Sequence, residues 1–275
     1  MDLDARTAVV TGAASGIGLA LTEACLDAGM SVVMADVEAH TLSAEAARLS
    51  DLGGAVVDVV CNVGDPDSIS ALRDRALEAF GAVHLLCNNA GVAPGYSALR
   101  TSPAMWRWVT DVNLLGVAYG IEAFAPLLVA QGFGHVVNTA SEAGLMATPT
   151  LAAYHATKYA VVGLSESLAM ELDGTGVGVS CVCPELVDTK IFESTRNAPS
   201  ELGLRPPREI PMSTIEAMMQ SEAKAPSEVA SAVLDAVRRD QFWVITHAIT
   251  YDRVRHRHDS LMQSRRPTMY VRPAT

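Results

Sequence analysis

The chain has 275 residues, of which 49% are apolar and 19% are charged, and its formal net charge is −11. This composition supports a large buried core and excludes a disordered or fibrous chain. The negative charge disfavours nucleic acids and anionic membrane surfaces as main partners, because both repel an acidic protein.

Seven short apolar blocks and six helical stretches alternate along the chain. The blocks predict β-strands at Thr7–Thr11, Ser31–Ala35, Gly54–Val60, Val83–Asn88, Gly134–Ala140, Val177–Cys183 and Phe242–Thr246. The helical patterns predict helices at Gly16–Ala28, Ala39–Leu52, Pro66–Phe80, Pro103–Ala130, Ala152–Leu172 and Pro226–Arg239. A glycine, which favours the left-handed backbone that ends a helix, follows several of these stretches: Gly29, Gly53, Gly81 and Gly174.

The predicted strands are continuously apolar rather than alternating, so both faces of the sheet are expected to be covered. We therefore expect an α/β fold, a Rossmann-type doubly wound parallel seven-stranded sheet with helices on both faces, in a single domain over residues 1–275. Residues 188–225 interrupt the alternation, contain four prolines, and are predicted to form an irregular substrate lid. Residues 249–275 contain six arginines and predict a C-terminal tail that is solvated or faces another subunit.

The first predicted strand leads into a glycine-rich turn, after which a helix begins. At such a turn, backbone N–H groups and the helix dipole bind a pyrophosphate. The spacing is GxxxGxG rather than the general GxGxxG, so an ordinary tight turn is the alternative, but the position between strand and helix favours a phosphate site. The residues expected there are Gly12, Ser15, Gly16, Ile17 and Gly18.

Asp36 follows the second predicted strand, eighteen residues after Gly18. A carboxylate at this position accepts hydrogen bonds from the ribose hydroxyls of NAD and repels the 2′-phosphate of NADP. Neither Ser15 nor Val37 supplies a compensating positive charge. The sequence therefore favours NAD, with Asp36 and Val37 beside its adenosine, and an ordinary surface aspartate is the alternative.

Tyr154 and Lys158 are four residues apart in a predicted helix, so they share one face of it. An ammonium group beside a phenol stabilises the phenolate and lowers the phenol pKa from its ordinary value of about 10, which makes tyrosine a usable general acid or base. Ser141 follows the fifth predicted strand, at the carboxyl edge where open α/β sheets bind ligands. The alternative for the tyrosine and the lysine is that a Tyr-xxx-Lys pair occurs by chance in many proteins. The alternative for Ser141 is that a loop serine often only caps a turn.

Taken together, these features resemble the classical short-chain dehydrogenase/reductase family over nearly the whole chain. The family's motifs occur in order as TGxxxGxG at Thr11–Gly18, NNAG at Asn88–Gly91, the active-site asparagine at Asn113, the catalytic serine at Ser141, and YxxxK at Tyr154 and Lys158. The resemblance implies an NAD-dependent alcohol dehydrogenase or carbonyl reductase. No spacing typical of metal ligands occurs in the sequence, and no metal is expected.

The resemblance also implies roles for individual residues. Tyr154 is expected to exchange a proton with the substrate oxygen, and Ser141 to hold that oxygen. Lys158 is expected to bond the nicotinamide ribose and lower the Tyr154 pKa, and Asn113 to anchor a water between Lys158 and solvent. Besides the glycine turn, Asp36, Val37, Tyr154 and Lys158, the cofactor is expected to contact Asn62, Val63, Asn89, Ala90, Gly91, Pro184, Val187 and Thr189.

Two positions depart from the family pattern. Asn62 stands where the family commonly has an aspartate that bonds the adenine, and its amide oxygen is still able to accept that bond. Glu185 stands where the family has a glycine after Pro184, which puts a charged side chain near the nicotinamide pocket. Either Glu185 reshapes the substrate site or it turns out to solvent.

The lid carries flexible apolar side chains that suggest a hydrophobic substrate pocket. These are Ile191, Phe192, Met212, Ile215, Met218 and Met219, with Leu145 and Met146 nearby. We expect a secondary alcohol or ketone on a hydrophobic or cyclic skeleton, and a lid helix that buries its own apolar face is the alternative. No arginine or lysine stands out as an anchor for a substrate carboxylate, although Lys190 and Arg196 are available.

Other activities remain open at this stage. One alternative function is a non-catalytic regulator that has the same fold and binds NAD but catalyses no reaction. An epimerase, a dehydratase or an enoyl reductase are further alternatives, and they agree less well with the sequence. No secretion signal and no apolar run long enough to span a bilayer is recognised, so we expect a cytoplasmic location. The expected partners are a small-molecule substrate and other copies of the chain in a tetramer or dimer.

Overall fold

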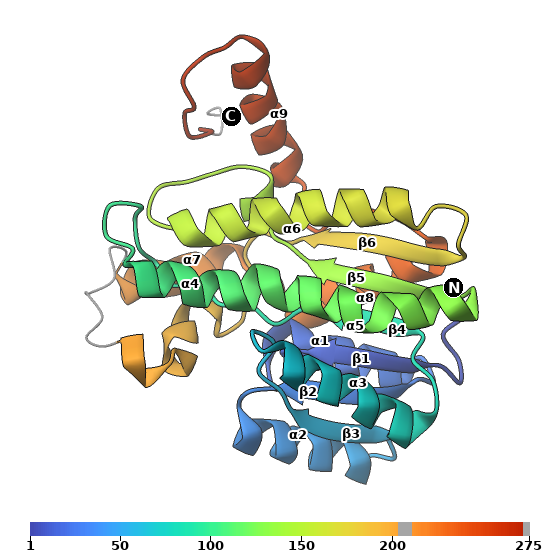
Figure 1. Cartoon of the computed structure of the whole chain (residues 1–275). Coiled ribbons are helices and arrows are strands. Elements are labelled where there is room, and N and C mark those ends of the chain that lie inside the picture. The colour runs from blue at the N-terminus through green and yellow to red at the C-terminus, as the bar shows by residue number, and fades with distance from the viewer. Residues whose placement is uncertain (203–210, 272–275) are drawn as a thin grey trace.

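A parallel seven-stranded sheet forms the centre of the protein, seen in a computed structural model that describes residues 1–202 and 211–271 (Figure 1). The strands are β1 (Thr7–Thr11), β2 (Ser31–Asp36), β3 (Val56–Val60), β4 (Leu85–Asn88), β5 (Gly134–Thr139), β6 (Val177–Cys183) and β7 (Trp243–Ile245). Their order is β3-β2-β1-β4-β5-β6-β7, and every neighbouring pair is parallel. The order reverses between β1 and β4, which is the switch point where such sheets bind ligands. The predicted fold class is confirmed.

Helices cover both faces of this sheet. In the described part of the chain the helices are α1 (Gly16–Asp27), α2 (Ala39–Asp51), α3 (Pro66–Phe80), α4 (Pro103–Thr110), α5 (Gly116–Gln131), α6 (Ala152–Glu171), α7 (Met212–Glu222), α8 (Pro226–Arg239) and α9 (Ile249–Met262). Those that pack on the sheet are α1, α2 and α8 on one face and α3, α5 and α6 on the other. Side chains alternate between the two faces of β1. Val10 packs with α1, α2 and α8 in one apolar core, and Val9 packs with α3, α5 and α6 in the other.

The stretch predicted as one helix over Pro103–Ala130 is interrupted. A π-helical turn at Asp111–Leu115 separates α4 from α5. Pro103–Gln131 also has the length and mean hydropathy (1.7) of a membrane span, although Arg107, Asp111 and Glu122 interrupt its apolar residues. In the fold, the most apolar part of this stretch is 44% buried, and Phe124 and Leu128 lie in the core beneath the sheet. Packing within the protein therefore accounts for part of these apolar residues.

The glycines predicted to end helices adopt the left-handed backbone. The φ angles of Gly29, Gly53, Gly81 and Gly174 are 80°, 91°, 77° and 76°. Glycine is therefore the residue expected at these four helix ends, because a Cβ atom would strain the left-handed backbone.

The segment of residues 188–225, which the sequence predicts to be a lid and which is called the lid below, is more regular than expected. Its two ends are joined by a bridge between Val187 and Lys224, and it contains two 3-10 helices, Ile191–Asn197 and Ser200–Leu202, before α7. Residues 203–210, with two of the prolines that suggested a lid, lie outside the described residues.

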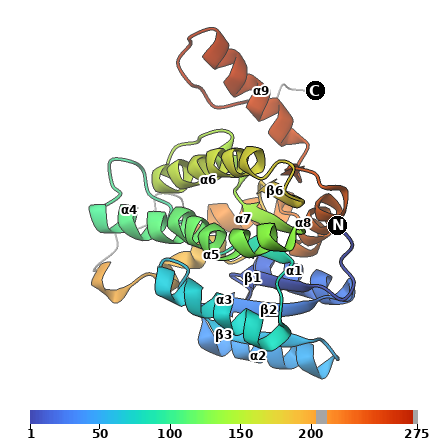
Figure 2. The ribbon, with the colours of Figure 1, turned by 45° about the vertical axis from the view of Figure 1, so that its right-hand side comes forward.

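The predicted C-terminal tail contains a helix. Residues 249–271, called the C-terminal arm below, consist of α9 and a following extended segment, and Arg272 lies outside the described residues. The arm stands away from the sheet in both views (Figures 1 and 2). Its helix was missed because its polar residues are spread round the axis, and Thr250 and Ser260 are its buried residues.

Candidate active site

A cavity of about 630 Å³ opens where the carboxyl ends of the strands meet the lid and the C-terminal arm. Most residues predicted to bind the cofactor or take part in catalysis line this cavity. They are Gly12, Ser15, Gly16, Ile17, Asp36, Val37, Asn62, Val63, Asn89, Ala90, Gly91, Ser141, Tyr154, Lys158, Pro184, Val187 and Thr189. Gly18 and Asn113 are buried behind its wall.

The glycine-rich turn has the shape that close approach of a ligand requires. Gly12 and Gly16 have φ angles of +67° and +56°. A Cβ atom on Gly18 would lie 2.0 Å from the Gly12 carbonyl oxygen, and one on Gly16 would lie 2.9 Å from Thr189 Cγ2. The first turn of α1, which begins at Gly16, has no acidic side chain. Its N–H groups and dipole therefore fit an anionic group such as a pyrophosphate.

Asp36 belongs to the wall of this cavity. Its Oδ2 accepts a hydrogen bond from the Ala14 N–H (3.0 Å), and its Oδ1 accepts one from the Glu38 N–H (3.0 Å). The carboxylate thus joins the glycine-rich turn to the end of β2. Because it also lines the cavity, its negative charge faces whatever ligand lies there.

Glu38 adds a second carboxylate at this end of the cavity, which sequence reasoning missed. Arg196 Nη2 donates to Glu38 Oε1 (2.6 Å), and Asn197 Nδ2 donates to the same oxygen (2.7 Å). Burial alone would raise the pKa of Glu38, but the hydrogen bonds from Asn197 and Arg196 hold that pKa below its usual value. These contacts fasten the lid to the loop after β2 and engage Arg196, which the sequence left available for a substrate.

Hydrogen bonds hold the ends of β1 and β4 together beneath the cavity. The Thr11 hydroxyl accepts from the N–H groups of Asn89 (2.9 Å) and Ala90 (3.1 Å), and Asn89 Nδ2 donates to the Thr11 carbonyl (3.0 Å). After β3, Asn62 Oδ1 accepts from the Gly64 N–H (3.1 Å). The NNAG segment therefore lies against the glycine-rich turn, and the Asn62 amide shapes its own loop at the cavity wall.

Asn113 lies in the π-helical turn and is fully buried. Its Oδ1 accepts from the Val92 N–H (2.8 Å), while its Nδ2 donates to the Val92 carbonyl (2.9 Å) and to the Thr157 hydroxyl (3.2 Å). A π-turn inserts an extra residue into a helix and commonly marks functional positions. Here the turn brings Asn113 to the segment after β4 and to α6, and its expected role in anchoring a water stays a prediction.

Tyr154, Lys158 and Ser141 gather at the cavity, as the sequence predicts. The Lys158 ammonium lies 5.7 Å from the centre of the Tyr154 ring and donates to the Thr139 carbonyl (2.6 Å). Ser141 Oγ accepts from the Ala143 N–H (3.1 Å) and donates to the Pro184 carbonyl (3.3 Å). One proton-bearing phenol, one ammonium and one hydroxyl therefore share a single buried space.

The pKa of Tyr154 is shifted in the opposite direction to the prediction. Burial raises it above its usual value, and the hydrogen bond with Ser141 opposes this only in part. Burial also lowers the pKa of Lys158 from 10.5 to about 8. Removal from water disfavours both charged forms, an effect that the sequence argument did not consider.

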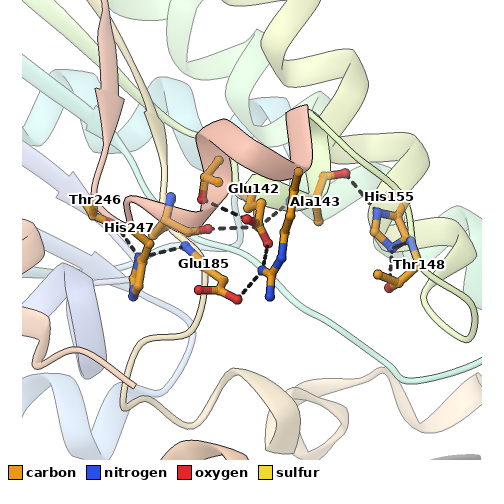
Figure 3. A network of polar contacts seen from close by, with 11 residues as sticks. Glu142, Ala143, Thr148, His155, Glu185, Thr246 and His247 are labelled. Atoms are coloured by element: carbon orange, nitrogen blue, oxygen red, sulfur yellow. Dashed lines mark hydrogen bonds and ion pairs between the residues drawn. The ribbon is translucent and has the colours of Figure 1, made fainter. Parts of the chain in front are cut away.

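His155 is a further residue of the site that sequence reasoning missed. Its Nε2 accepts from the Thr148 N–H (3.0 Å), so Nδ1 carries the proton and donates to the Ala143 carbonyl (2.9 Å; Figure 3). The ring therefore holds the loop that follows Ser141 against α6. Its position next to Tyr154 was the signal available in the sequence.

Glu185 reaches the C-terminal arm rather than open solvent. Arg253 Nη1 contacts Glu185 Oε1 and also donates to Glu142 Oε2 (2.6 Å), and all three residues line the cavity (Figure 3). Thr250 Oγ1 donates to the other oxygen of Glu142 (2.7 Å). The glutamate that replaces the family's glycine at position 185 is thus paired with Arg253, which lies in the segment predicted to be a tail.

The rest of the cavity wall is largely apolar. Met146, Ile191 and Phe192 line it as predicted, while Leu145 and Met219 are not part of it. The side chains of Met212, Ile215 and Met218 lie outside the described residues. Sequence reasoning missed further lining residues: Val92, Trp108, Leu151, Met269 and Tyr270.

The chain is similar to known proteins over most of its length. A family model described as short chain dehydrogenase matches residues 6–200. A 1-deoxy-11-beta-hydroxypentalenate dehydrogenase of Streptomyces exfoliatus is 36% identical over 95% of this chain and 90% of its own. A 3beta-hydroxysteroid dehydrogenase 2 of Eggerthella lenta is 35% identical over 74% of this chain and 78% of its own. A short chain dehydrogenase/reductase from Burkholderia phymatum, solved in complex with NAD, has a TM-score of 0.95 and 37% identity, covering 99% of this chain and 100% of that chain.

Proposed function

The chain belongs to the short chain dehydrogenase family of oxidoreductases, and on this premise we propose that it transfers a hydride between NAD(H) and a secondary alcohol or ketone. The proposed substrate carries this group on a hydrophobic or cyclic skeleton. The observation that carries the proposal is one cavity lined by Tyr154, Lys158 and Ser141 together with a glycine-rich turn fit for a dinucleotide.

The residues present fit a nicotinamide dinucleotide. The turn from Gly12 to Gly18 and the N-terminus of α1 would hold the pyrophosphate, and Asp36 would hold the adenosine ribose. The Asp36 carboxylate at this end disfavours the 2′-phosphate of NADP, whereas the charge of Glu38 is already paired with Arg196. The similar Burkholderia phymatum protein was solved with NAD, which supports the same choice. When bound, the nicotinamide supplies or accepts the hydride.

Tyr154 is the proposed proton-transfer group. In reduction its phenol gives a proton to the substrate oxygen, and in oxidation it takes the proton back. The Ser141 hydroxyl, which accepts from the Ala143 N–H, would turn from the Pro184 carbonyl and donate its hydrogen bond to that oxygen as charge develops there. Because Ser141 and Tyr154 lie on different segments joined by His155, their relative position is fixed before a substrate arrives.

Lys158 and Asn113 have supporting roles in the proposal. The Lys158 ammonium would hydrogen-bond the nicotinamide ribose and favour the Tyr154 phenolate. With a pKa of about 8, Lys158 remains charged near neutral pH. Asn113 is proposed to anchor a water that leads protons from Lys158 to solvent.

The substrate class follows from the cavity wall and from the relatives. Trp108, Met146, Ile191, Phe192 and Tyr270 offer an extended apolar surface. Two similar proteins are named as dehydrogenases of a hydroxypentalenate and a hydroxysteroid. These names support an alcohol on a bulky skeleton rather than a small hydrophilic alcohol.

The test is a panel of alcohols with NAD and of ketones with NADH, followed by nicotinamide absorbance. Cyclic and aromatic secondary alcohols, including hydroxysteroids, should react faster than small hydrophilic alcohols. A panel in which the small alcohols react best would overturn the substrate class. NAD binding without turnover of any compound would favour a non-catalytic NAD-binding regulator instead.

We also propose a cytoplasmic location and an assembly of identical chains, as a dimer or tetramer. The proposed interface includes the C-terminal arm, which carries several exposed apolar side chains: Tyr251, Leu261, Met262, Met269 and Val271. Residues 249–275 hold six arginines and two aspartates, whereas the rest of the chain has 14 basic and 29 acidic residues. A basic arm therefore complements the acidic body of a second copy.

A further inference from the structure

We infer that Arg253 is a positioning residue for the reaction: it clamps Glu142 and Glu185 together and thereby holds Ser141 in place. The inference rests on the proposed function, because it assigns Ser141 to the substrate oxygen. It goes beyond that function in connecting a helix of the C-terminal arm to the serine loop.

The clamp joins three distant segments of the chain. Arg253 lies on α9, Glu142 directly follows Ser141 after β5, and Glu185 follows Pro184 after β6. One nitrogen, Arg253 Nη1, contacts a carboxylate oxygen of each glutamate. Figure 3 shows Glu142 and Glu185 close to each other in one network of polar contacts.

The two glutamates repel each other unless a cation lies between them. The Glu142 side chain is 8% exposed and that of Glu185 is 15% exposed, so water screens their charges poorly. The hydrogen bond from Thr250 stabilises Glu142 but carries no positive charge. Arg253 therefore supplies the charge that allows both carboxylates to remain at this wall of the cavity.

The backbone connects the clamp to the catalytic serine. The Glu142 N–H donates to the Pro184 carbonyl (2.8 Å), and the Ser141 hydroxyl donates to the same oxygen (3.3 Å). Glu142 is thus the sequence neighbour of Ser141, and Glu185 is the sequence neighbour of Pro184, whose carbonyl Ser141 contacts. A separation of Glu142 from Glu185 would pull these two backbone segments apart and shift the serine oxygen.

The arm also completes the substrate end of the cavity. After α9 the chain returns to place Met269 and Tyr270 in the cavity wall. Arg253 fixes the first half of α9 to the body of the protein. Loss of the clamp should therefore raise the KM for the substrate as well as lower kcat.

The experiment compares the full-length wild type with Arg253→Met, Arg253→Lys and the double variant Arg253→Met/Glu185→Gln. Arg255→Met is the matched control, because Arg255 lies on the same helix, is exposed, and pairs with Asp252 of that helix (3.0 Å). The measurements are kcat and KM for the best compound of the panel. Hydrogen exchange of the backbone amides of residues 141–146 and 266–271, in protein without cofactor, gives a readout independent of turnover.

Arg253→Met should lower kcat/KM by about 10- to 100-fold, as expected for a displaced catalytic group, and speed exchange in both segments. The double variant should recover a large part of kcat, because it removes one of the two repelling charges. Arg253→Lys should lie between these variants and the wild type, since it keeps the charge and loses the planar fork. Arg255→Met should match the wild type.

A role limited to attaching α9 predicts a different result. The double variant would then be as impaired as Arg253→Met, and exchange would increase in residues 266–271 but not in 141–146. That outcome, or unchanged kinetics and exchange in Arg253→Met, overturns the inference. If Arg253→Met does not fold, the same decision rests on the double variant and Arg253→Lys. If the wild type turns over no compound, the proposed function fails, while the exchange data still decide whether Arg253 holds the serine loop.

Discussion

Burial makes the Tyr154 phenol a poor acid, and the residues around it have to compensate. Its pKa is raised by removal from water, and the Ser141 hydroxyl opposes this shift. In the proposed reduction this phenol starts protonated, as a proton donor has to, but its raised pKa opposes release of the proton. The proposed reaction therefore has two requirements, namely a group that holds the proton and neighbours that stabilise the charge left behind.

Removal of the Tyr154 hydroxyl should slow the turnover of substrate and leave the affinity for NAD unchanged. In Tyr154→Phe we expect kcat to fall by about 10²- to 10⁴-fold, the usual contribution of a positioned proton-transfer group. The measurement is steady-state turnover together with NAD affinity from a binding titration. Substantial remaining turnover with tight NAD binding would mean that another group transfers the proton.

Lys158 should make the stability of the protein depend on alkaline pH. Its pKa falls from 10.5 to about 8 on folding, so between these values the unfolded chain holds a proton that the folded chain has released. Folding stability therefore rises with pH in this window, by on the order of 3 kcal/mol, and the cost of burying the ammonium persists below pH 8. Denaturant unfolding of the wild type and Lys158→Met across this window measures the difference. Two curves that run parallel would show that the pKa of Lys158 is not lowered in the folded protein.

Asp36 should set the preference between the two dinucleotides. In Asp36→Asn, loss of the negative charge should improve the affinity for NADP relative to NAD by at least about tenfold. The amide oxygen retains one acceptor for the N–H groups of Ala14 and Glu38, so the turn is disturbed less than by alanine. Asp58→Asn, which removes an exposed charge from β3, is the control. A wild type that already binds NADP as tightly as NAD would contradict this use of Asp36.

Among the elements, the junction between β1 and α1 depends on glycine for steric reasons. A Cβ atom on Gly18 would lie 2.0 Å from the Gly12 carbonyl oxygen, whereas one on Gly163 of α6 would meet no atom within 4 Å. Both glycines lie in helices, so alanine raises helix propensity at both positions. A difference between the two variants therefore measures the effect of crowding at Gly18.

Gly18→Ala should therefore weaken NAD binding and destabilise the protein by roughly 1–3 kcal/mol, as overpacked sites do. Gly163→Ala should stabilise it by about 0.5–1 kcal/mol, because alanine restricts the unfolded chain at an exposed helical position. Denaturant unfolding and an NAD titration on both variants give the comparison. Equal effects of the two substitutions would rule out crowding at the turn.

The sequence predicted elements well where burial dictates composition. Strands β1 and β6 agree residue for residue with the prediction, because continuous apolar runs covered on both faces leave little choice of boundary. The π-turn at Asp111–Leu115 was not predictable, because one extra residue barely changes an apolar helical pattern. The helix α9 was missed because little of it is buried.

In the candidate site, too, some features could be predicted from the sequence and others could not. The glycine-rich turn and the Tyr154–Lys158 pair are encoded by residues close in sequence, and the prediction found them. The Arg196–Glu38 and Arg253–Glu185 contacts join residues 158 and 68 positions apart. A single sequence carries no signal for such pairs, since only the fold brings them together.

At the scale of the whole molecule, charge is unevenly distributed between the acidic body and the basic arm. If the arm binds a second copy, as proposed, the assembly should weaken as salt screens the attraction. In Arg265→Glu/Arg266→Glu the species of higher mass should decrease at low salt, and light scattering on a sizing column measures this. Arg75→Glu, an exposed arginine of α3 that pairs with Glu78, is the control. An unchanged mass in the arm variant would remove the arm from the interface.

The cavity wall extends along the chain from Gly12 to Tyr270, and this has a consequence for biosynthesis. A ribosome that has translated residues 1–200 has already produced the phosphate turn and Tyr154. The helix α8, whose Val233 and Val237 cover α1 and the sheet, has not yet been made, nor have Arg253 and Tyr270. The nascent polypeptide thus leaves the part of its sheet and of α1 that α8 covers exposed until translation is nearly finished.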